Sequence, residues 1–211
     1  MEEVVQGTEA WQLLRVGKAT ASKFADVMST KKTGGETVAR RDYRMELVVE
    51  RLTGRPTPVF VSWPMKQGTE REPAARVAFE AYTGIYVEHA QFIEHPELLA
   101  GASPDGLIED DAGLELKCPI ASTHFDYLRL PHGACPAEYE WQVHGGMWIT
   151  GRKRWFFGSF NPEFPEHLQL VIREIKRDDA KIEALDKGVR QFLTEVASDT
   201  EFALSLKGGL S

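Results

Sequence analysis

The 211-residue sequence predicts an α/β (α+β) domain in which helices flank a central mixed β-sheet. Three observations predict this class. Three helical patterns occur within the first 82 residues, short apolar runs between Pro, Gly and Asp follow them, and a helix, two strands and a long helix close the chain. Helices and strands that occur in blocks along one chain favour a sheet covered by helices.

The helices are predicted from the spacing of apolar residues and from the residues at their ends. Their ranges are 21–28, 38–52, 73–82, 138–149 and 178–203. Pro73 suits the first turn of the third helix, and Gly84 closes it. The last helix is amphipathic, and Gly188 is a candidate break within it.

The strands are predicted from short apolar runs that end at turn-forming residues. Their ranges are 85–93, 98–103, 106–109, 113–118, 155–161 and 168–174. Because the first four follow one another closely, we expect them to form a β-meander. The polar, glycine-containing residues 30–37 are expected to form a loop between the first two helices.

Composition narrows the class of function without selecting one. The net charge of −7 argues against a protein that coats nucleic acid non-specifically, but it allows a local basic groove. The two cysteines are too few for a disulfide framework and indicate reduced thiols. We find neither a signal-peptide pattern nor a run of about 18 apolar residues, so we expect a cytoplasmic protein that makes no contact with a membrane.

The segment GLELKCP, residues 113–119, places an acid and an amine side by side. In a strand, side chains alternate between the two faces, so Glu115 and Lys117 point to the same side. Leu114, Leu116 and Cys118 then point to the other side, into a core. Taken alone, such a pair is most often an exposed ion pair.

Asp105 lies ten residues earlier, in the turn SPDG, residues 103–106. Antiparallel pairing across the turn at residues 110–113 would bring Asp105 close to Glu115. Two carboxylates on adjacent strands form an oxygen site for Mg²⁺, with Mn²⁺ as an alternative and a second ion expected beside the first. Lys117 can orient the attacking water, or deprotonate it if the lysine pKa is lowered. This arrangement suits phosphodiester hydrolysis.

These residues, with several others, resemble one family. The matching motifs are LRVGKATAS at 14–22, GTERE at 68–72 with AR at 75–76, FE at 79–80 and TG at 83–84, SPDGL at 103–107, GLELKCP at 113–119, and QV at 142–143 with MWIT at 147–150. In this order they resemble the bacteriophage lambda exonuclease and YqaJ-type viral recombinase family, within the PD-(D/E)XK nuclease superfamily. The resemblance implies a PD-(D/E)XK, restriction-endonuclease-like core.

The resemblance also implies an activity and an assembly. The expected enzyme is a metal-dependent 5′-to-3′ exonuclease that degrades one strand of linear double-stranded DNA and leaves a 3′ single-stranded tail. Expected partners are 5′-phosphorylated DNA ends, two further copies of the chain in a homotrimeric ring, and a single-strand annealing protein of phage recombination. A phage or prophage would encode the enzyme, which would act in the bacterial cytoplasm.

Under the same resemblance the chain, residues 1–211, is a single nuclease domain. Its N-terminal helical part covers about residues 1–60, its catalytic core about 61–175 and its C-terminal helix about 178–203.

Carried over position by position, the resemblance assigns roles around the metal. Asp105 and Glu115 would bind the ion with the Leu116 carbonyl as a possible third ligand, and Lys117 would position the nucleophilic water. Glu72 would face the metal from its helix, with Glu70 as a competing assignment. Gln142 would hold the attacking water or a phosphate.

The resemblance further assigns Arg15, Ser22 and Ser103 to a pocket for the 5′-terminal phosphate. An arginine binds phosphate through paired donors, and small hydroxyls add to an anion site. The alternative is that Thr20 and Ser22 cap the helix that follows them.

Three other residues are assigned to contacts with DNA. Met65 corresponds to an apolar wedge that separates the terminal base pair, and the alternative is a core methionine. Lys31 and Lys32 would follow the DNA backbone from their loop, and the alternative is a solvated pair of charges. An endonuclease built on the same core, and a non-catalytic module that binds DNA ends, are the competing functions.

Overall fold

The computed structural model describes residues 6–58 and 62–206. Its helices are α1 (Glu9–Arg15), α2 (Phe24–Met28), α3 (Val38–Thr53), α4 (Trp63–Thr83), α5 (Ala121–Leu128), α6 (Glu140–Thr150) and α7 (Asp179–Ser205), and its 3-10 helices are η1 (Ala21–Lys23), η2 (Ala137–Tyr139) and η3 (Glu166–Leu168). Its strands are β1 (Ala19–Thr20), β2 (Ile93–Glu94), β3 (Ala100–Ala102), β4 (Gly106–Ile108), β5 (Ala112–Lys117), β6 (Arg154–Phe160) and β7 (Leu170–Lys176).

A mixed four-stranded sheet lies at the centre of the molecule, in the order β4-β5-β6-β7. The β4–β5 and β6–β7 pairs are antiparallel, and β5 and β6 are parallel. In the β4–β5 hairpin Gly106 pairs with Leu114, so the residue before β4 lies beside the end of β5. The mixed α/β class and this hairpin are as predicted.

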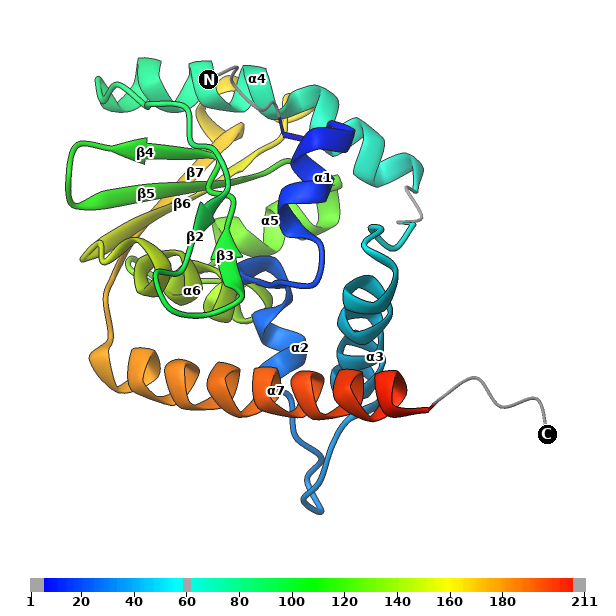
Figure 1. Cartoon of the computed structure of the whole chain (residues 1–211). Helices are drawn as coiled ribbons and strands as arrows, with labels where there is room; N and C mark the ends of the chain where they lie inside the picture. Colours follow the sequence, from blue (N-terminus) through cyan, green and yellow to red (C-terminus); the bar gives the residue numbers. More distant parts are fainter. Residues whose placement is uncertain (1–5, 59–61, 207–211) are drawn as a thin grey trace.

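Helices cover both faces of this sheet (Figure 1). On one face Leu114 and Phe156 pack with Phe79 of α4, in a cluster of buried apolar residues. On the other face Trp155 and Phe157 pack with side chains of α6 and α7. Because the strand periodicity is two, odd-numbered residues of β5 and β6 face α6 and even-numbered residues face α4.

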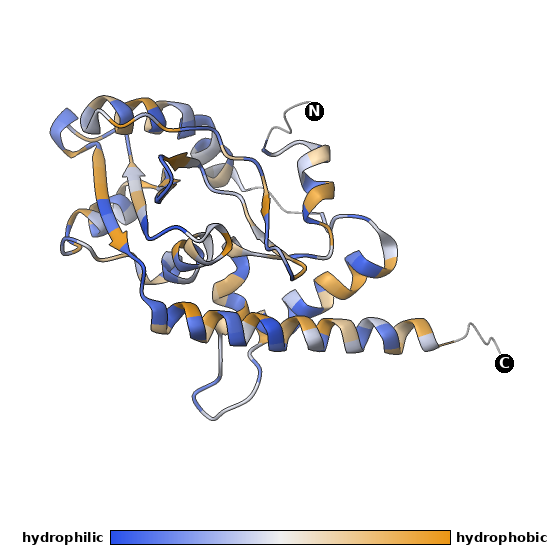
Figure 2. Cartoon of the chain, turned by 60° about the vertical axis from the view of Figure 1, so that its left-hand side comes forward, coloured by the Kyte–Doolittle hydropathy of each residue, from blue (hydrophilic) through white to orange (hydrophobic). Residues whose placement is uncertain are grey.

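A second core lies where α7 crosses α2 and α3, at the end of the molecule opposite α4 (Figure 1). Tyr43 of α3 stacks on Phe192 of α7, with ring centroids 5.5 Å apart. Apolar and hydrophilic residues alternate along α7 (Figure 2), as an amphipathic helix requires. A three-stranded sheet in the order β1-β3-β2 borders this core.

The structure corrects the expected β-meander. Of residues 85–93, only Ile93 belongs to a strand, and Glu88 makes an isolated bridge to Leu107. Strands β2 and β3 pair with each other in the smaller sheet, where β3 also pairs with β1, and β4 pairs with β5 in the larger sheet. The short runs are separated by turns as predicted, but the expected pairing is interrupted between β3 and β4, which belong to different sheets.

Two helices extend beyond their predicted limits. Helix α4 begins at Trp63, ten residues before the expected start, and continues through Pro73. The Ser62 hydroxyl caps it, and the buried residues Ala75 and Phe79 anchor the turns that follow Pro73. Helix α7 continues through Gly188, where a Cβ would overlap the sulfur of Met28. That glycine therefore permits the close approach of α2 and does not break the helix.

Helices α1 and α5 were not predicted from the sequence, and both are short. Residues 1–5 and 59–60 of the predicted N-terminal part lie outside the described residues. Within the described residues, no helix is both long and apolar enough to cross a membrane.

Candidate active site

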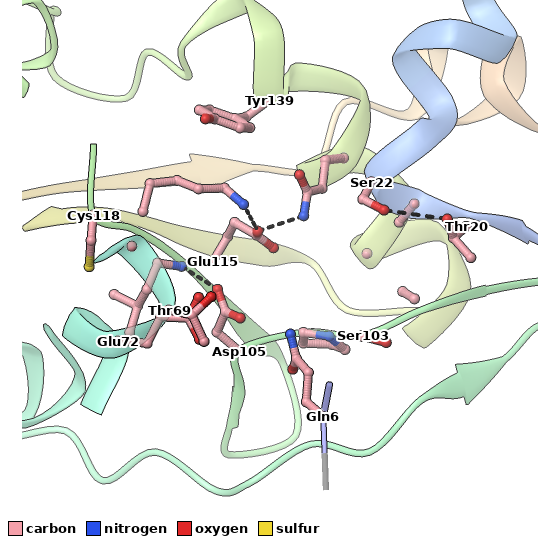
Figure 3. A pocket seen from close by; sticks show the side chains of 18 of the residues that line it. Gln6, Thr20, Ser22, Thr69, Glu72, Ser103, Asp105, Glu115, Cys118 and Tyr139 are labelled. Atoms are coloured by element: carbon pink, nitrogen blue, oxygen red, sulfur yellow. Dashed lines mark hydrogen bonds and ion pairs between the residues drawn. The ribbon is translucent and has the colours of Figure 1, made fainter. Parts of the chain in front are cut away.

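A cleft of about 520 Å³ opens between α1, α4, α6 and the end of β5 (Figure 3). Ten of the twelve predicted site residues line it: Arg15, Ser22, Met65, Glu72, Ser103, Asp105, Glu115, Leu116, Lys117 and Gln142. Residues that lie as far apart as positions 15 and 142 therefore meet in one place, as the resemblance implied. The two predicted residues that do not line it are Lys31 and Lys32.

Asp105 occupies the turn between β3 and β4. Its backbone N–H donates to the Leu114 carbonyl at 3.0 Å, and its carboxylate Oδ2 accepts the Leu116 N–H at 2.6 Å. Burial raises the pKa of Asp105, and Lys117 and the Leu116 N–H partly oppose that rise. The predicted approach of Asp105 to the end of β5 is confirmed.

Glu115 and Lys117 lie together on the α6 face of β5. Lys117 Nζ is 2.6 Å from Glu115 Oε1, and the Gln142 amide of α6 donates to the same oxygen at 2.5 Å. Glu115 is only 4% exposed, because α6 and the aromatic side chains of β6 cover this face. The predicted alternation is confirmed, because Leu114, Leu116 and Cys118 pack in the apolar cluster on the α4 side, and the face that carries Glu115 is buried as well.

The neighbouring carboxylates of Glu115 and Asp105 affect the pKa of Lys117. Burial alone lowers the pKa of Lys117, but Glu115 and Asp105 outweigh it, so that the pKa of the ammonium lies above its ordinary value. Burial also raises the pKa of Glu115 despite the neighbouring ammonium. In the absence of a bound cation, Lys117 is thus the cationic partner of Glu115 and Asp105.

Glu72 faces the same cleft from α4 (Figure 3). Burial, followed by the negative charge of Asp105, raises the pKa of Glu72 to about 7. Glu70 is exposed and does not line the cleft. The geometry therefore favours Glu72 over Glu70 as the helical glutamate of the site.

Asp105 and Glu115 are the candidate ligands for Mg²⁺. Asp105, in the turn before β4, and Glu115, on β5, supply carboxylate oxygens, and burial raises the pKa of both. Among the described residues, no group of three or more His, Cys, Asp or Glu side chains is arranged to hold an ion. Mg²⁺ commonly takes one or two carboxylates and completes its shell with water and substrate phosphate, so two carboxylates fit.

The other end of the cleft is cationic. The guanidinium of Arg15, at the end of α1, donates to the Ser103 hydroxyl at 3.1 Å and lies 4.0 Å from the centre of the Trp11 ring. The Thr20 and Ser22 hydroxyls are 3.3 Å apart (Figure 3). Thr20 precedes η1 but makes no capping hydrogen bond, so the helix-cap alternative is not what the structure shows. Burial lowers the pKa of Arg15, which stays charged.

The three residues expected to touch DNA differ in position. Met65 is 51% exposed on α4 and lines the cleft, so it is not a core methionine. Lys31 and Lys32 are exposed in the loop between α2 and α3, which projects away from α4 (Figure 1). Their role remains a prediction.

The structure adds site residues that the sequence did not indicate. Tyr139 lines the cleft, with its ring 4.8 Å from Lys117 Nζ, and Trp11 packs on Arg15. Each precedes a predicted site residue by three or four positions, the spacing of neighbours on a helix. That spacing is the signal that could have found Trp11, had α1 been predicted.

Comparisons with known proteins agree with this site. The chain matches the YqaJ-like viral recombinase domain over residues 10–153. An alkaline exonuclease (LHK-Exo) from Laribacter hongkongensis superposes with a TM-score of 0.86 at 36% identity, covering 93% of this chain and 96% of that one. The structure of LHK-Exo in complex with dAMP gives a TM-score of 0.85, with the same identity and coverage.

A phage-related exonuclease from Haemophilus somnus 129PT shares the fold, with a TM-score of 0.70 at 14% identity over 90% of this chain and 96% of that one. The comparison with curated proteins gave no match. The family match spans more than half of the chain, and LHK-Exo is similar over nearly all of it. The chain therefore belongs to the YqaJ-like viral recombinase family and is an exonuclease of the alkaline, phage-recombinase type.

Proposed function

We propose that this enzyme is a Mg²⁺-dependent 5′-to-3′ exonuclease that degrades one strand of linear double-stranded DNA. The observation that carries the proposal is that Asp105, Glu115 and Lys117 share one cleft with Arg15 and Ser103. A hydrolytic site needs acids and a lysine, but only an enzyme that starts at a strand end benefits from a terminal-phosphate pocket beside them. LHK-Exo has a complex with dAMP, and a nucleotide of that kind is the product expected here.

Different residues of the cleft would bind the terminal phosphate and the cation. Arg15, Ser22 and Ser103 would hold the 5′-terminal phosphate, which fixes the distance from the strand end to the bond that is cut. Asp105, Glu115 and the Leu116 carbonyl would hold the cation, of which a second copy is expected beside the first. When bound, Mg²⁺ polarises the phosphodiester and stabilises the oxygen that leaves.

Other groups in the cleft would position water and charge. Lys117, as an ammonium, would orient the attacking water and offset the charge that develops on the phosphate. The Gln142 amide, held 2.5 Å from Glu115, would orient the water or a phosphate oxygen from the opposite side. Glu72, with its pKa of about 7, would accept a proton from that water near neutral pH. Met65, at the mouth of the cleft, would separate the terminal base pair.

The proposed function includes an assembly and a partner. Family membership favours a homotrimeric ring around DNA and a single-strand annealing protein that receives the 3′ tail. Exposed apolar side chains on α3 and α7 are compatible with such contacts: Val38, Met45, Val49, Leu52, Phe202 and Leu204. A single nuclease domain, encoded by a phage or prophage and acting in the bacterial cytoplasm, completes the proposal. Light scattering that gave a stable monomer would remove the ring.

Digestion of DNA tests the activity. Linear duplex, labelled at either 5′ or 3′ ends, is incubated with enzyme and Mg²⁺ beside closed circular plasmid, with Lys117→Ala as the inactive control. The proposal expects nucleotide release from 5′ ends of linear DNA, intact circles and no release by the variant. Cut circles would favour the endonuclease, and bound but uncut linear ends would favour a binding module.

A further inference from the structure

Arg76 lies on α4 four residues after Glu72, on a part of the helix that is held firmly. Its neighbours Ala75 and Phe79 are fully buried against the four-stranded sheet. The Arg76 guanidinium donates through Nη2 to the backbone carbonyl of Asp105 and through Nη1 to that of Val87, the latter at 3.4 Å. A single side chain thus connects the helix that carries Glu72 to the turn that carries Asp105.

The second carbonyl, that of Val87, belongs to a segment that α4 also holds. The Val87 N–H donates to the Glu80 carboxylate of α4 at 2.9 Å. The next residue, Glu88, exchanges two backbone hydrogen bonds with Leu107 of β4, at 2.8 and 2.9 Å. Arg76 therefore bridges two backbone segments that meet beside the start of β4.

The packing around this bridge leaves little freedom. A Cβ on Gly106 would overlap the Val87 side chain, so the turn after Asp105 lies directly against the Val87 segment. The remaining backbone and side-chain bonds of Asp105 go to Leu114 and Leu116 of β5. Arg76 is thus the connection that ties the Asp105 turn to α4, while β5 ties it to the sheet.

The chemistry of the bridge requires an arginine. A guanidinium presents several donors in one plane and can serve two carbonyls at once, whereas an ammonium is a compact point charge on a flexible stem. Groups that orient metal ligands commonly change metal affinity or activity about 10–100-fold when they are removed. The cationic side chain also lies near the Asp105 carboxylate, whose negative charge it partly offsets.

We propose that Arg76 is a positioning residue that holds the backbone of Asp105 at a fixed place relative to Glu72, so that the two carboxylates meet the same reacting centre. This inference rests on the proposed function. It adds a residue that touches neither substrate nor cation. Its expected effect is on the turnover rate and on cation affinity, with DNA binding left unchanged.

The test compares Arg76→Lys with Arg71→Lys. Arg71 lies five residues earlier on α4 and pairs with the exposed carboxylate of Glu163, outside the cleft, so its variant controls for the charge and for the helix. Mn²⁺ binding is measured by calorimetry on the full chain without DNA, and kcat and KM are measured on 5′-phosphorylated duplex. For Arg76→Lys we expect about tenfold weaker Mn²⁺ binding and a kcat about 10–100-fold lower, with KM nearly unchanged. Arg71→Lys should match wild type.

Wild-type Mn²⁺ affinity and kcat in Arg76→Lys, or equal losses in both variants, would overturn the inference. If Arg76→Lys does not fold, Arg76→Gln takes its place with the same expectations, because the shorter, uncharged amide cannot bridge the Asp105 and Val87 carbonyls. A wild-type enzyme that binds Mn²⁺ but releases no nucleotide would refute the proposed function, and the Mn²⁺ affinities of the variants would still decide the role of Arg76. A wild-type enzyme that binds no Mn²⁺ would overturn both.

Discussion

The two ends of the cleft differ in the charge of the ligand that each would bind. At the reaction end, Glu72, Asp105 and Glu115 gather around one ammonium, and the pKa of each carboxyl is raised. At the phosphate end, the Arg15 guanidinium is held by a hydroxyl and an aromatic ring. The first end needs a cation and the second needs an anion, and a metal-bound DNA end would supply both.

The ends also differ in construction. The reaction end lies on the central sheet and two helices of 21 and 11 residues. The phosphate end is built from a seven-residue helix, a 3-10 turn and the chain after a three-residue strand. The residues of the reaction are therefore anchored in the core, whereas the residues expected to recognise the strand end lie on short elements beside it.

The largest expected effect follows from Asp105→Asn at the reaction end. The amide keeps the shape and can still accept the Leu116 N–H, but it removes an anionic ligand. We expect nucleotide release to fall on the order of a thousandfold. Because one of three crowded carboxylates is lost, the melting temperature without metal should stay unchanged or rise.

Rates and thermal melts of wild type and Asp105→Asn, with binding of 5′-phosphorylated duplex measured in parallel, check this prediction. Binding should change less than about threefold, because the substitution leaves the phosphate end intact. A variant that retains activity, or that loses DNA binding as well, would show that the two ends are not separate.

Arg15→Ala at the phosphate end should act on one class of substrate. Charge-assisted hydrogen bonds to phosphate are worth about 1.5–3 kcal/mol, which corresponds to roughly 10–100-fold in rate on 5′-phosphorylated ends. Digestion of 5′-hydroxyl ends, which lack the anion, should change little. The two initial rates, compared for wild type and variant, measure the effect, and equal losses on both substrates would assign Arg15 to the chemistry instead.

The reaction end should also make stability depend on pH and Mg²⁺. The folded pKa of Glu72, about 7, lies above its ordinary value of 4.5, so the stability it contributes is complete below pH 4.5 and is lost as pH rises through about 7. Without divalent cations, the melting temperature should therefore fall between pH 5 and 8. Mg²⁺ at a hundredfold excess over its Kd should restore about 2.7 kcal/mol at pH 8 and less at pH 5.

Thermal melts at the two pH values, with Mg²⁺ or with a chelator, check this linkage. Arg15→Ala serves as the matched control and should show the same Mg²⁺ shift as wild type, because it lies at the other end. A Mg²⁺ shift that is larger at pH 5 would contradict the account.

The smallest effect is expected for Lys31→Ala with Lys32→Ala, which lie outside the cleft. If both lysines contact DNA phosphates, the slope of log binding constant against log salt should become shallower by about two, with kcat unchanged. An unchanged slope would identify the pair as solvated charges. Binding titrations between low and moderate salt distinguish the two results.

Sequence patterns predicted the strand residues of the reaction end well because their contacts are local, whereas Glu72 was assigned by resemblance to the family. Asp105 and Glu115 are joined by one short hairpin, and alternation alone places Lys117 beside Glu115. The burial of the Glu115 side chain could not be predicted from such local patterns. It depends on the parallel pairing of β5 with β6, which joins residues about forty positions apart through a crossover.

The phosphate end gave weaker signals. Arg15 meets Ser103 across 88 positions, through two-residue and three-residue strands that are too short to show any periodicity. Its residues were found only by resemblance to the family, and their roles remain predictions. Helix α4 is the opposite case. Pro73 predicted the start of a helix, but the helix continues through Pro73 because tertiary packing stabilises it.

One measurement tests most directly whether both ends of the cleft act on the same strand end. A linear duplex carries a 5′ phosphate at one end only, and the release of labelled nucleotides from each end is followed in Mg²⁺. Wild-type enzyme is expected to start at the phosphorylated end at least about tenfold faster, and Arg15→Ala is expected to remove most of this difference. Equal release from both ends by the wild-type enzyme would show that the phosphate end of the cleft does not select the strand that is cut.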